Sequence, residues 1–350
     1  MSVNNLPTYQ YTIKELTRKK RIKHLLLGNG FSMAYDSKIF SYNALSTFID
    51  NSDDLLLKQL FKSINTKNFE VIMQQLDLFA NVAKVFNAEK TLIDNIQQTS
   101  VHLKDSLIDA IQVMHPEHVF KLPEEKSIAC CSFLNDYLSN DGNVFTSNYD
   151  LLLYWVLMRN TLKNAGDGFG RELENPLGDD FVPNYEPDYS ELRWGKNKES
   201  QKVFYLHGAL HLFDTGIDIV KEEYNGDLLL NNIKARMQNK EYPIFVTAGN
   251  ANEKLTHIMH NRYLTFCYEK LSAITGSLIT FGFNFGDNDT HIIDAINKAA
   301  QQPVSDSLRS VYIGVYSDGD LEHIERIEKK IKCRVRKYNA KTANVWNEIS

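Results

Sequence analysis

A glycine turn near the N-terminus is the first segment suited to ligand chemistry. It directly follows the apolar run at residues 24–27 and comprises Gly28, Asn29, Gly30, Phe31 and Ser32. Two glycines at the end of a strand permit a tight turn, and the amides of a following helix can bind phosphate. The third glycine of a dinucleotide fingerprint is missing, because Met33 stands in its place. A simple strand-to-helix turn explains the pattern as well as nucleotide binding does.

Two further segments place polar side chains directly after apolar runs. In TSNYD, residues 146–150, Asn148 and Asp150 precede an apolar helix. The motif suits a catalytic carboxamide, but Asn or Asp at this boundary can also simply cap the helix. His207, followed by Gly208, ends the run that starts at Lys202. Histidine is the commonest general base near neutral pH, although an isolated buried histidine is more often bonded to backbone.

Seven apolar runs separated by predicted helices supply the elements that position these segments. The runs begin at His24, Asn143, Lys202, Tyr242, Ser277, Ser310 and Cys333. Their uninterrupted apolar character indicates strands buried on both faces, so we predict an α/β fold with a doubly wound, Rossmann-like parallel sheet. Such a sheet brings the carboxyl ends of its strands to one edge. GNGFS, TSNYD and LHG are therefore expected to meet in one crevice.

The chain between the first two runs has helical periodicity. Phe69, Ile72, Met73 and Leu76 begin a series of apolar residues at steps of three and four. We expect a helical insertion at residues 40–139 within a single domain spanning residues 1–350. Residues 164–200 are rich in Gly, Pro, Asp and Asn and are expected to form a long loop.

Composition excludes several functional classes. The 350 residues include 39 basic and 44 acidic side chains, a net charge of -5, so direct nucleic-acid binding is not expected. Apolar stretches are too short for a membrane span, and the N-terminus lacks a signal-peptide pattern. We expect a cytoplasmic protein.

Metal ligands are not evident in the sequence. The four cysteines form no CxxC pair, which disfavours both a disulfide framework and a structural zinc site. His257 and His260 have a spacing that suits one helix face, but no third ligand is identifiable. We therefore expect no metal.

The three motifs, in this order on an α/β chain, resemble the sirtuin signatures GAGxS, TQNxD and HG. FGFNFGDND, residues 281–289, is similar to a glycine-containing segment of bacterial sirtuin-like domains. The whole pattern is most similar to the sirtuin-like proteins of prokaryotic defence systems. The resemblance implies an NAD+-binding fold with Asn148, His207 and Asp150 at catalytic positions. It also implies NAD+ contacts from Gly28, Asn29, Gly30, Phe31, Ser32, Phe40, Ser147, Gly249, Gly282 and Asp287.

Departures from the sirtuin pattern narrow the expected activity. Deacylating sirtuins carry paired CxxC motifs after the HG histidine, and here no cysteine lies between Cys131 and Cys267. The GIPDFR element is also missing. Protein deacylation and ADP-ribosyl transfer are thus disfavoured, and an NAD+ hydrolase releasing nicotinamide and ADP-ribose remains.

The resemblance also suggests a biological role. An NAD-depleting enzyme must be restrained, so we expect a regulated effector of antiviral defence that acts by abortive infection. A homo-oligomer, a defence-system partner or a phage trigger would control it, with the helical insertion covering the crevice. The alternative is a non-catalytic subunit that senses NAD+ or ADP-ribose, or serves as a scaffold.

Overall fold

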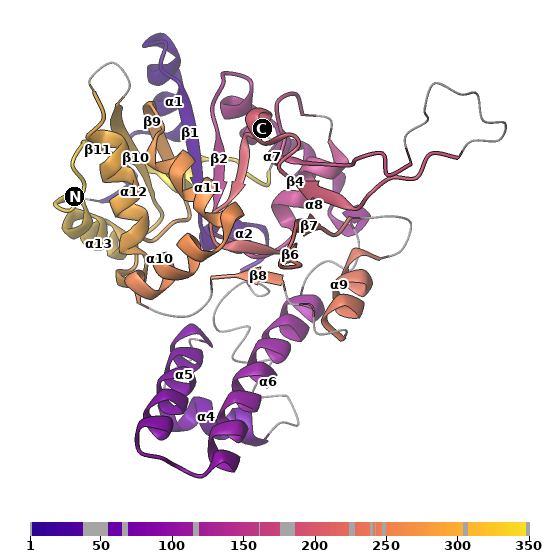
Figure 1. The fold of residues 1–350 in the computed structure, drawn as a ribbon. Helices are drawn as coiled ribbons and strands as arrows, with labels where there is room; N and C mark the ends of the chain where they lie inside the picture. Colours follow the sequence, from indigo (N-terminus) through magenta and orange to yellow (C-terminus); the bar gives the residue numbers. More distant parts are fainter. Residues whose placement is uncertain are drawn as a thin grey trace.

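The computed structural model describes most of the chain (Figure 1). The described ranges are 2–37, 55–64, 69–114, 119–160, 162–175, 186–223, 228–238, 241, 243–246, 250–303 and 307–347. Phe40 and Gly249, two of the residues expected to contact NAD+, lie outside these ranges. None of the helices within these ranges is both long and apolar enough to cross a membrane.

Six strands form a parallel sheet. They are β1 (Lys23–Leu27), β2 (Val144–Thr146), β5 (Val203–Tyr205), β9 (Gly276–Phe281), β10 (Leu308–Val315) and β11 (Arg334–Asn339). Their order across the sheet is β11–β10–β9–β1–β2–β5, and every pairing is parallel. Counted along the chain this is the 6-5-4-1-2-3 arrangement of a doubly wound sheet, whose direction of winding reverses between β1 and β9. The predicted Rossmann-like parallel sheet is confirmed.

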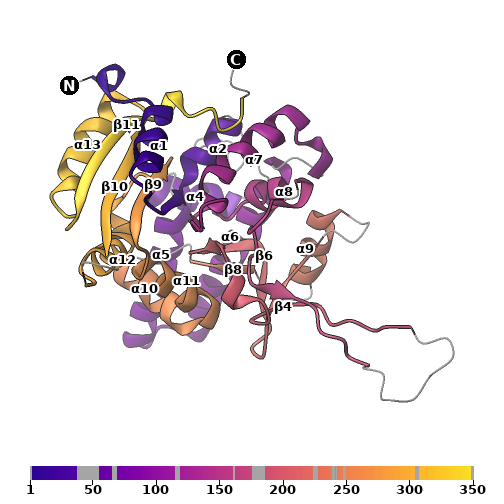
Figure 2. The ribbon, with the colours of Figure 1, turned by 90° about the horizontal axis from the view of Figure 1, so that it is seen from above.

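Helices cover both faces of this sheet, which explains the uninterrupted burial of its central strands. All five residues of β1 are buried. Helices α1 (Tyr9–Arg18) and α7 (Glu124–Leu138) lie on one face, and α11 (Arg262–Ser272), α12 (Thr290–Ala300) and α13 (Asp318–Glu328) lie on the other (Figures 1 and 2). The remaining elements on this part of the chain are α2 (Asn29–Tyr35), α10 (Ala251–His260), η1 (Val3–Asn5), η3 (Lys198–Ser200), η4 (Asp287–Asp289) and η5 (Ala340–Thr342).

A second, antiparallel sheet was not expected. Its strands are β3 (Phe169–Gly170), β4 (Leu192–Trp194), β6 (Gly208–Asp214), β7 (Ile219–Lys221) and β8 (Pro243–Phe245), in the order β3–β4–β7–β6–β8. The run beginning at Tyr242 therefore contributes β8 to this sheet, and its assignment to the parallel sheet was wrong. The segment 164–200 likewise contains two strands. Helices α8 (Leu152–Arg159) and α9 (Leu229–Gln238) share a hydrophobic cluster with β6 and β7.

A change of chain direction at Gly208 explains why β6 was not predicted as a separate strand. Gly208 has φ +81°, a left-handed conformation that glycine adopts without strain. A Cβ at this position would lie 1.9 Å from the carbonyl oxygen of Ile244. The chain thus turns from β5 into β6 within one continuous apolar run, against the backbone of β8.

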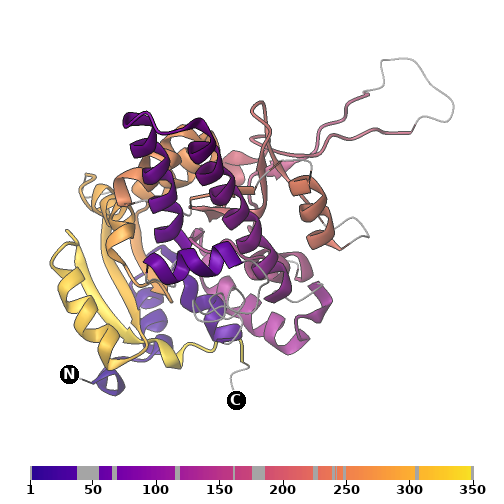
Figure 3. The same ribbon diagram turned by 90° about the horizontal axis from the view of Figure 1, so that it is seen from below.

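Between β1 and β2 the regular elements of the described residues are all helices. They are α2, α4 (Leu55–Ile64), α5 (Phe69–Val85), α6 (Lys90–Met114), η2 (Val119–Lys121) and α7. Helix α7 packs on β1 and β2 as part of the α/β layers. Helices α4, α5 and α6 lie beyond the carboxyl edge of the parallel sheet (Figures 1 and 3).

Candidate functional site

Strand register brings the predicted motifs to one edge of the sheet. Leu27 pairs with Thr146 on one side and with Phe281 on the other, and Thr146 pairs with Tyr205. The glycine turn and Gly282 begin one residue beyond these pairs. Asn148 and His207 each lie two residues beyond theirs. Four segments far apart in sequence therefore end side by side next to the reversal point, where ligands of open α/β sheets bind.

The glycines of the GNG turn permit a close approach between two backbones. A Cβ on Gly28 or on Gly30 would lie 2.6 Å from backbone atoms of Gly282. The amide of Gly30 donates to the Gly282 carbonyl (2.9 Å), and that of Phe31 donates to the Gly28 carbonyl (2.8 Å). Two amides expected to face phosphate are thus used within the protein in this conformation.

Ser32 joins the glycine turn to the TSNYD segment. Asn148 Nδ2 donates to Ser32 Oγ at 2.9 Å, and Ser32 Oγ donates to Asp150 Oδ2 at 2.5 Å. Ser32 is fully buried and Asn148 is 9% exposed. The serine side chain therefore fixes the carboxamide and the carboxylate relative to each other.

Asp150 contacts the following helix, as expected of a cap, and also binds Ser32. Its Oδ1 accepts from the amide of Leu152 at 2.9 Å, so the carboxylate caps the first turn of α8. Burial raises the pKa of Asp150, while the hydrogen bond from Ser32 and the bond from the Leu152 amide oppose that shift. The carboxylate thus caps α8 through one oxygen and orients Ser32 through the other.

Val246, the residue directly after β8, links the TSNYD segment to His207. Tyr149 Oη donates to the carbonyl of Val246 at 2.9 Å, and the amide of Val246 donates to the carbonyl of His207 at 3.0 Å. One side-chain bond and one backbone bond to Val246 therefore connect the residues that follow β2 and β5.

His207 is buried against a second histidine. Its Nε2 lies 2.9 Å from Nε2 of His291, and the two atoms share a hydrogen bond. Burial lowers the pKa of His207 well below the ordinary value for histidine, and the nearby His291 and Lys254 lower it further. Burial lowers the pKa of His291 to about 4. Both rings are neutral at physiological pH, so one donates and the other accepts.

An ion pair completes this cluster. Lys254, only 3% exposed, donates through Nζ to Asp289 Oδ1 at 3.1 Å. Ligand atoms of His207, Asp289 and His291 all lie within 4.8 Å of one another.

Sequence reasoning missed Lys254, Asp289 and His291. Lys254 belongs to an amphipathic helix, where a lysine is typical of the solvent-facing side. Asp289 ends the glycine-containing segment at residues 281–289 and His291 lies two residues further on, and that position is the signal that could have identified them.

The other residues expected to contact NAD+ are placed differently. Phe31 is buried, and its ring centroid lies 4.8 Å from that of Trp346. The Ser147 amide donates to the Leu27 carbonyl at 3.0 Å. The Asp287 side chain is 92% exposed and lies 3.8 Å from Lys330 Nζ. Asn29 is exposed at the start of α2. Asp289, not Asp287, is the acid beside the histidine pair.

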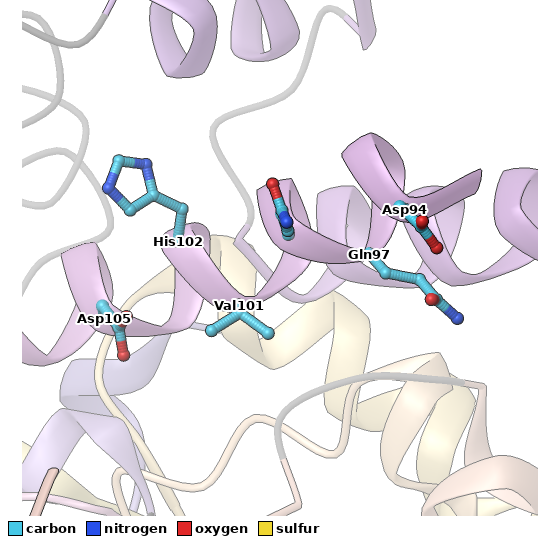
Figure 4. A pocket seen from close by; sticks show the side chains of 6 residues that line it. Asp94, Gln97, Val101, His102 and Asp105 are labelled. Atoms are coloured by element: carbon cyan, nitrogen blue, oxygen red, sulfur yellow. The ribbon is translucent and has the colours of Figure 1, made fainter. Parts of the chain in front are cut away.

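A separate pocket of about 350 Å³ lies beside α6, away from the parallel sheet (Figure 4). Its lining residues are Asp94, Gln97, Gln98, Val101, His102 and Asp105. All six belong to α6.

Comparison with known protein families places the chain in a group. A family model described as a domain of unknown function, DUF4917, matches residues 25–346. The chain belongs to the DUF4917 family. The match begins within β1 and ends after β11, so the family's domain includes nearly all of the parallel sheet and the whole histidine cluster. No curated protein matches the chain.

Proposed function

We propose that this DUF4917 protein is an NAD+ hydrolase that cleaves the nicotinamide N-glycosidic bond. The observation that carries the proposal is the register of the sheet edge. It aligns the Ser32-bound carboxamide of Asn148 with a neutral His207 on adjacent strands, next to the reversal point. A dinucleotide lying across that point would bring its ribose to both side chains.

The reaction needs little acid catalysis. Nicotinamide leaves as a neutral molecule from a positively charged pyridinium, and the ribose passes through an oxocarbenium-like transition state. Water then adds to the anomeric carbon, so NAD+ and water give nicotinamide, ADP-ribose and one proton. The protein has to fix the ribose and admit one water to its open face.

Asn148 suits the first of these tasks. Its Nδ2 is held by Ser32 at 2.9 Å, which sets the plane of the amide. The amide keeps its carbonyl oxygen and a second N–H for a ribose hydroxyl or the attacking water. Asp150 accepts a hydrogen bond from Ser32 Oγ and so acts as a positioning residue.

His207 suits the second task. Because burial lowers its pKa, the ring is neutral and can accept a proton from a ribose hydroxyl or from water. His291 holds the ring in place through the Nε2 contact. Activity is expected to be retained through neutral pH and lost only at acid pH, when His207 becomes protonated.

The helical segment supplies a means of control in this proposal. Helices α4, α5 and α6 lie beyond the catalytic edge (Figure 3), where an inserted subdomain can shield the ribose from bulk water and carry self-association. A role as an NAD-depleting effector in antiviral defence rests on the motif resemblance.

Product analysis tests the proposal. Purified full-length protein is incubated with NAD+ in H₂¹⁸O, and nicotinamide, ADP-ribose and cyclic ADP-ribose are separated. Hydrolysis predicts equal amounts of nicotinamide and ADP-ribose, with the label on ADP-ribose. Cyclisation would give unlabelled cyclic product. Saturable NAD+ binding without nicotinamide release would instead favour the non-catalytic sensor.

A further inference from the structure

The histidine pair has the composition of a cation site. Two imidazoles and one carboxylate, from His207, His291 and Asp289, converge with ligand atoms within 4.8 Å of one another. Both histidines are buried, at 3% and 1% exposure, while Asp289 is partly exposed. The carboxylate therefore leaves a route to solvent, and the imidazoles are held in place by packing.

The spacing of the two rings is close to what a shared metal requires. Two nitrogens bound to one tetrahedral zinc ion lie about 3.3 Å apart, given Zn–N bonds of about 2.0–2.1 Å. The Nε2 atoms of His207 and His291 are 2.9 Å apart, so a few tenths of an ångström of opening would admit the ion. The proton shared between the two Nε2 atoms would move to Nδ1 of its ring.

Asp289 can act as the third ligand without losing its ion pair. Lys254 Nζ contacts Oδ1 at 3.1 Å, and a carboxylate has a second oxygen that can turn toward the cation. Imidazole and carboxylate ligands with one position left for water suit zinc and neighbouring divalent ions.

Lys254 decides how strongly such a site binds. The carboxylate and the ammonium cancel, so the cluster offers a divalent cation no net negative charge. A fixed positive charge beside the cation weakens binding. The charges therefore favour a reversible site over a permanently filled one.

We propose that His207, His291 and Asp289 form a reversible divalent-cation site of the zinc class, and that its occupation inhibits the enzyme. Metal binding uses the Nε2 lone pair of His207 and leaves the ring proton on Nδ1, so neither nitrogen of the ring can then accept a proton. The inhibitory part rests on the proposed NAD+ hydrolysis, whereas the cation site does not.

Binding is tested first, without NAD+. Full-length protein prepared without a metal-affinity tag is titrated with ZnCl₂ by calorimetry, and with Co²⁺ by visible absorption. We expect one ion per chain. Asp289→Asn and His291→Gln should weaken binding at least tenfold, because loss of a direct ligand costs no less than loss of its supporting partner. Lys254→Met should strengthen binding about tenfold by removing the like charge.

His257→Gln is the matched control, because this histidine is exposed on α10 outside the cluster. Its titration should equal that of the wild type. Absence of wild-type binding at millimolar zinc would overturn the site. Equal binding by Asp289→Asn and His291→Gln would also overturn it.

Inhibition is tested separately by nicotinamide release. Zinc should slow wild-type turnover, EDTA should restore it, and Asp289→Asn should need at least tenfold more zinc. Loss of turnover on adding EDTA would overturn the inhibitory role. Zinc binding with the expected variant pattern, in a chain that never releases nicotinamide, would support the cation site and refute the proposed hydrolysis.

Discussion

Gly30→Ala isolates the close contact between the glycine turn and the end of β9. Gly30 is the second residue of α2, where alanine is normally favoured over glycine by up to about 1 kcal/mol. Here the added Cβ would lie 2.6 Å from Gly282 Cα. Carbon atoms pack best at about 3.5–4.0 Å, so the two backbones must separate by about 1 Å.

Overpacking of this kind costs about 1–3 kcal/mol, which exceeds the gain in helix propensity. We therefore expect Gly30→Ala to lower the free energy of unfolding by about 1–2 kcal/mol. Gly319→Ala is the matched control, because Gly319 is the second residue of α13 and its Cβ would meet only Ser317 Oγ at 3.7 Å. That variant should be as stable as the wild type or slightly more stable.

Thermal unfolding of both variants, at one scan rate, measures the difference. The Gly30→Ala midpoint should lie several degrees below that of Gly319→Ala. Displacement of α2 would also move Ser32 away from Asn148, so NAD+ cleavage should fall with it. Equal midpoints for the two variants would refute the packing argument.

Two further substitutions test buried polar groups. Burial lowers the pKa of His24 to about 4 in the folded chain. As the pH is lowered from about 6.5 to 4, this histidine is therefore protonated in the unfolded chain before the folded one, and the free energy of unfolding decreases. His24→Gln can still accept from the Asn143 amide, which donates to His24 Nδ1 at 3.0 Å. Urea unfolding should show about 3 kcal/mol less acid destabilisation at pH 4 than in the wild type, and an unchanged loss would contradict this origin. In the wild type, Lys221 Nζ lies 2.5 Å from a carboxylate oxygen of the largely buried Asp167. Lys221→Met removes this positive charge, and it should lower the free energy of unfolding by about 3 kcal/mol in the same assay. Adding Asp167→Leu should recover most of that loss, and a double variant no better than the single one would exclude charge burial as the cause.

The parallel sheet could be predicted because its central strands are buried on both faces. Such strands appear as short apolar runs, and β1 and β9 were found on that signal. The same signal does not report strand direction, so the run that contains β8 was placed in the wrong sheet. Nor does it mark the reversal at Gly208, where the apolar pattern continues from β5 into β6.

The candidate site could be predicted where a sequence motif marked it. Ser32, Asn148 and Asp150 belong to motifs that follow β1 and β2, and the structure joins them by hydrogen bonds. The partners of His207 are different. Lys254 lies on α10 and His291 lies on α12. Both side chains are buried by residues distant in sequence, so their burial is evident only in the tertiary structure.

Nicotinamide release from NAD+ by matched asparagine variants tests the central claim most directly. Asn148→Ala removes the carboxamide held by Ser32, whereas Asn140→Ala truncates an exposed asparagine after α7. The proposal predicts wild-type turnover in Asn140→Ala and a loss of about a hundredfold or more in Asn148→Ala, with both variants folded. Wild-type turnover in Asn148→Ala would contradict the assignment of the site. The absence of nicotinamide release from the wild-type chain would contradict the proposed hydrolysis itself.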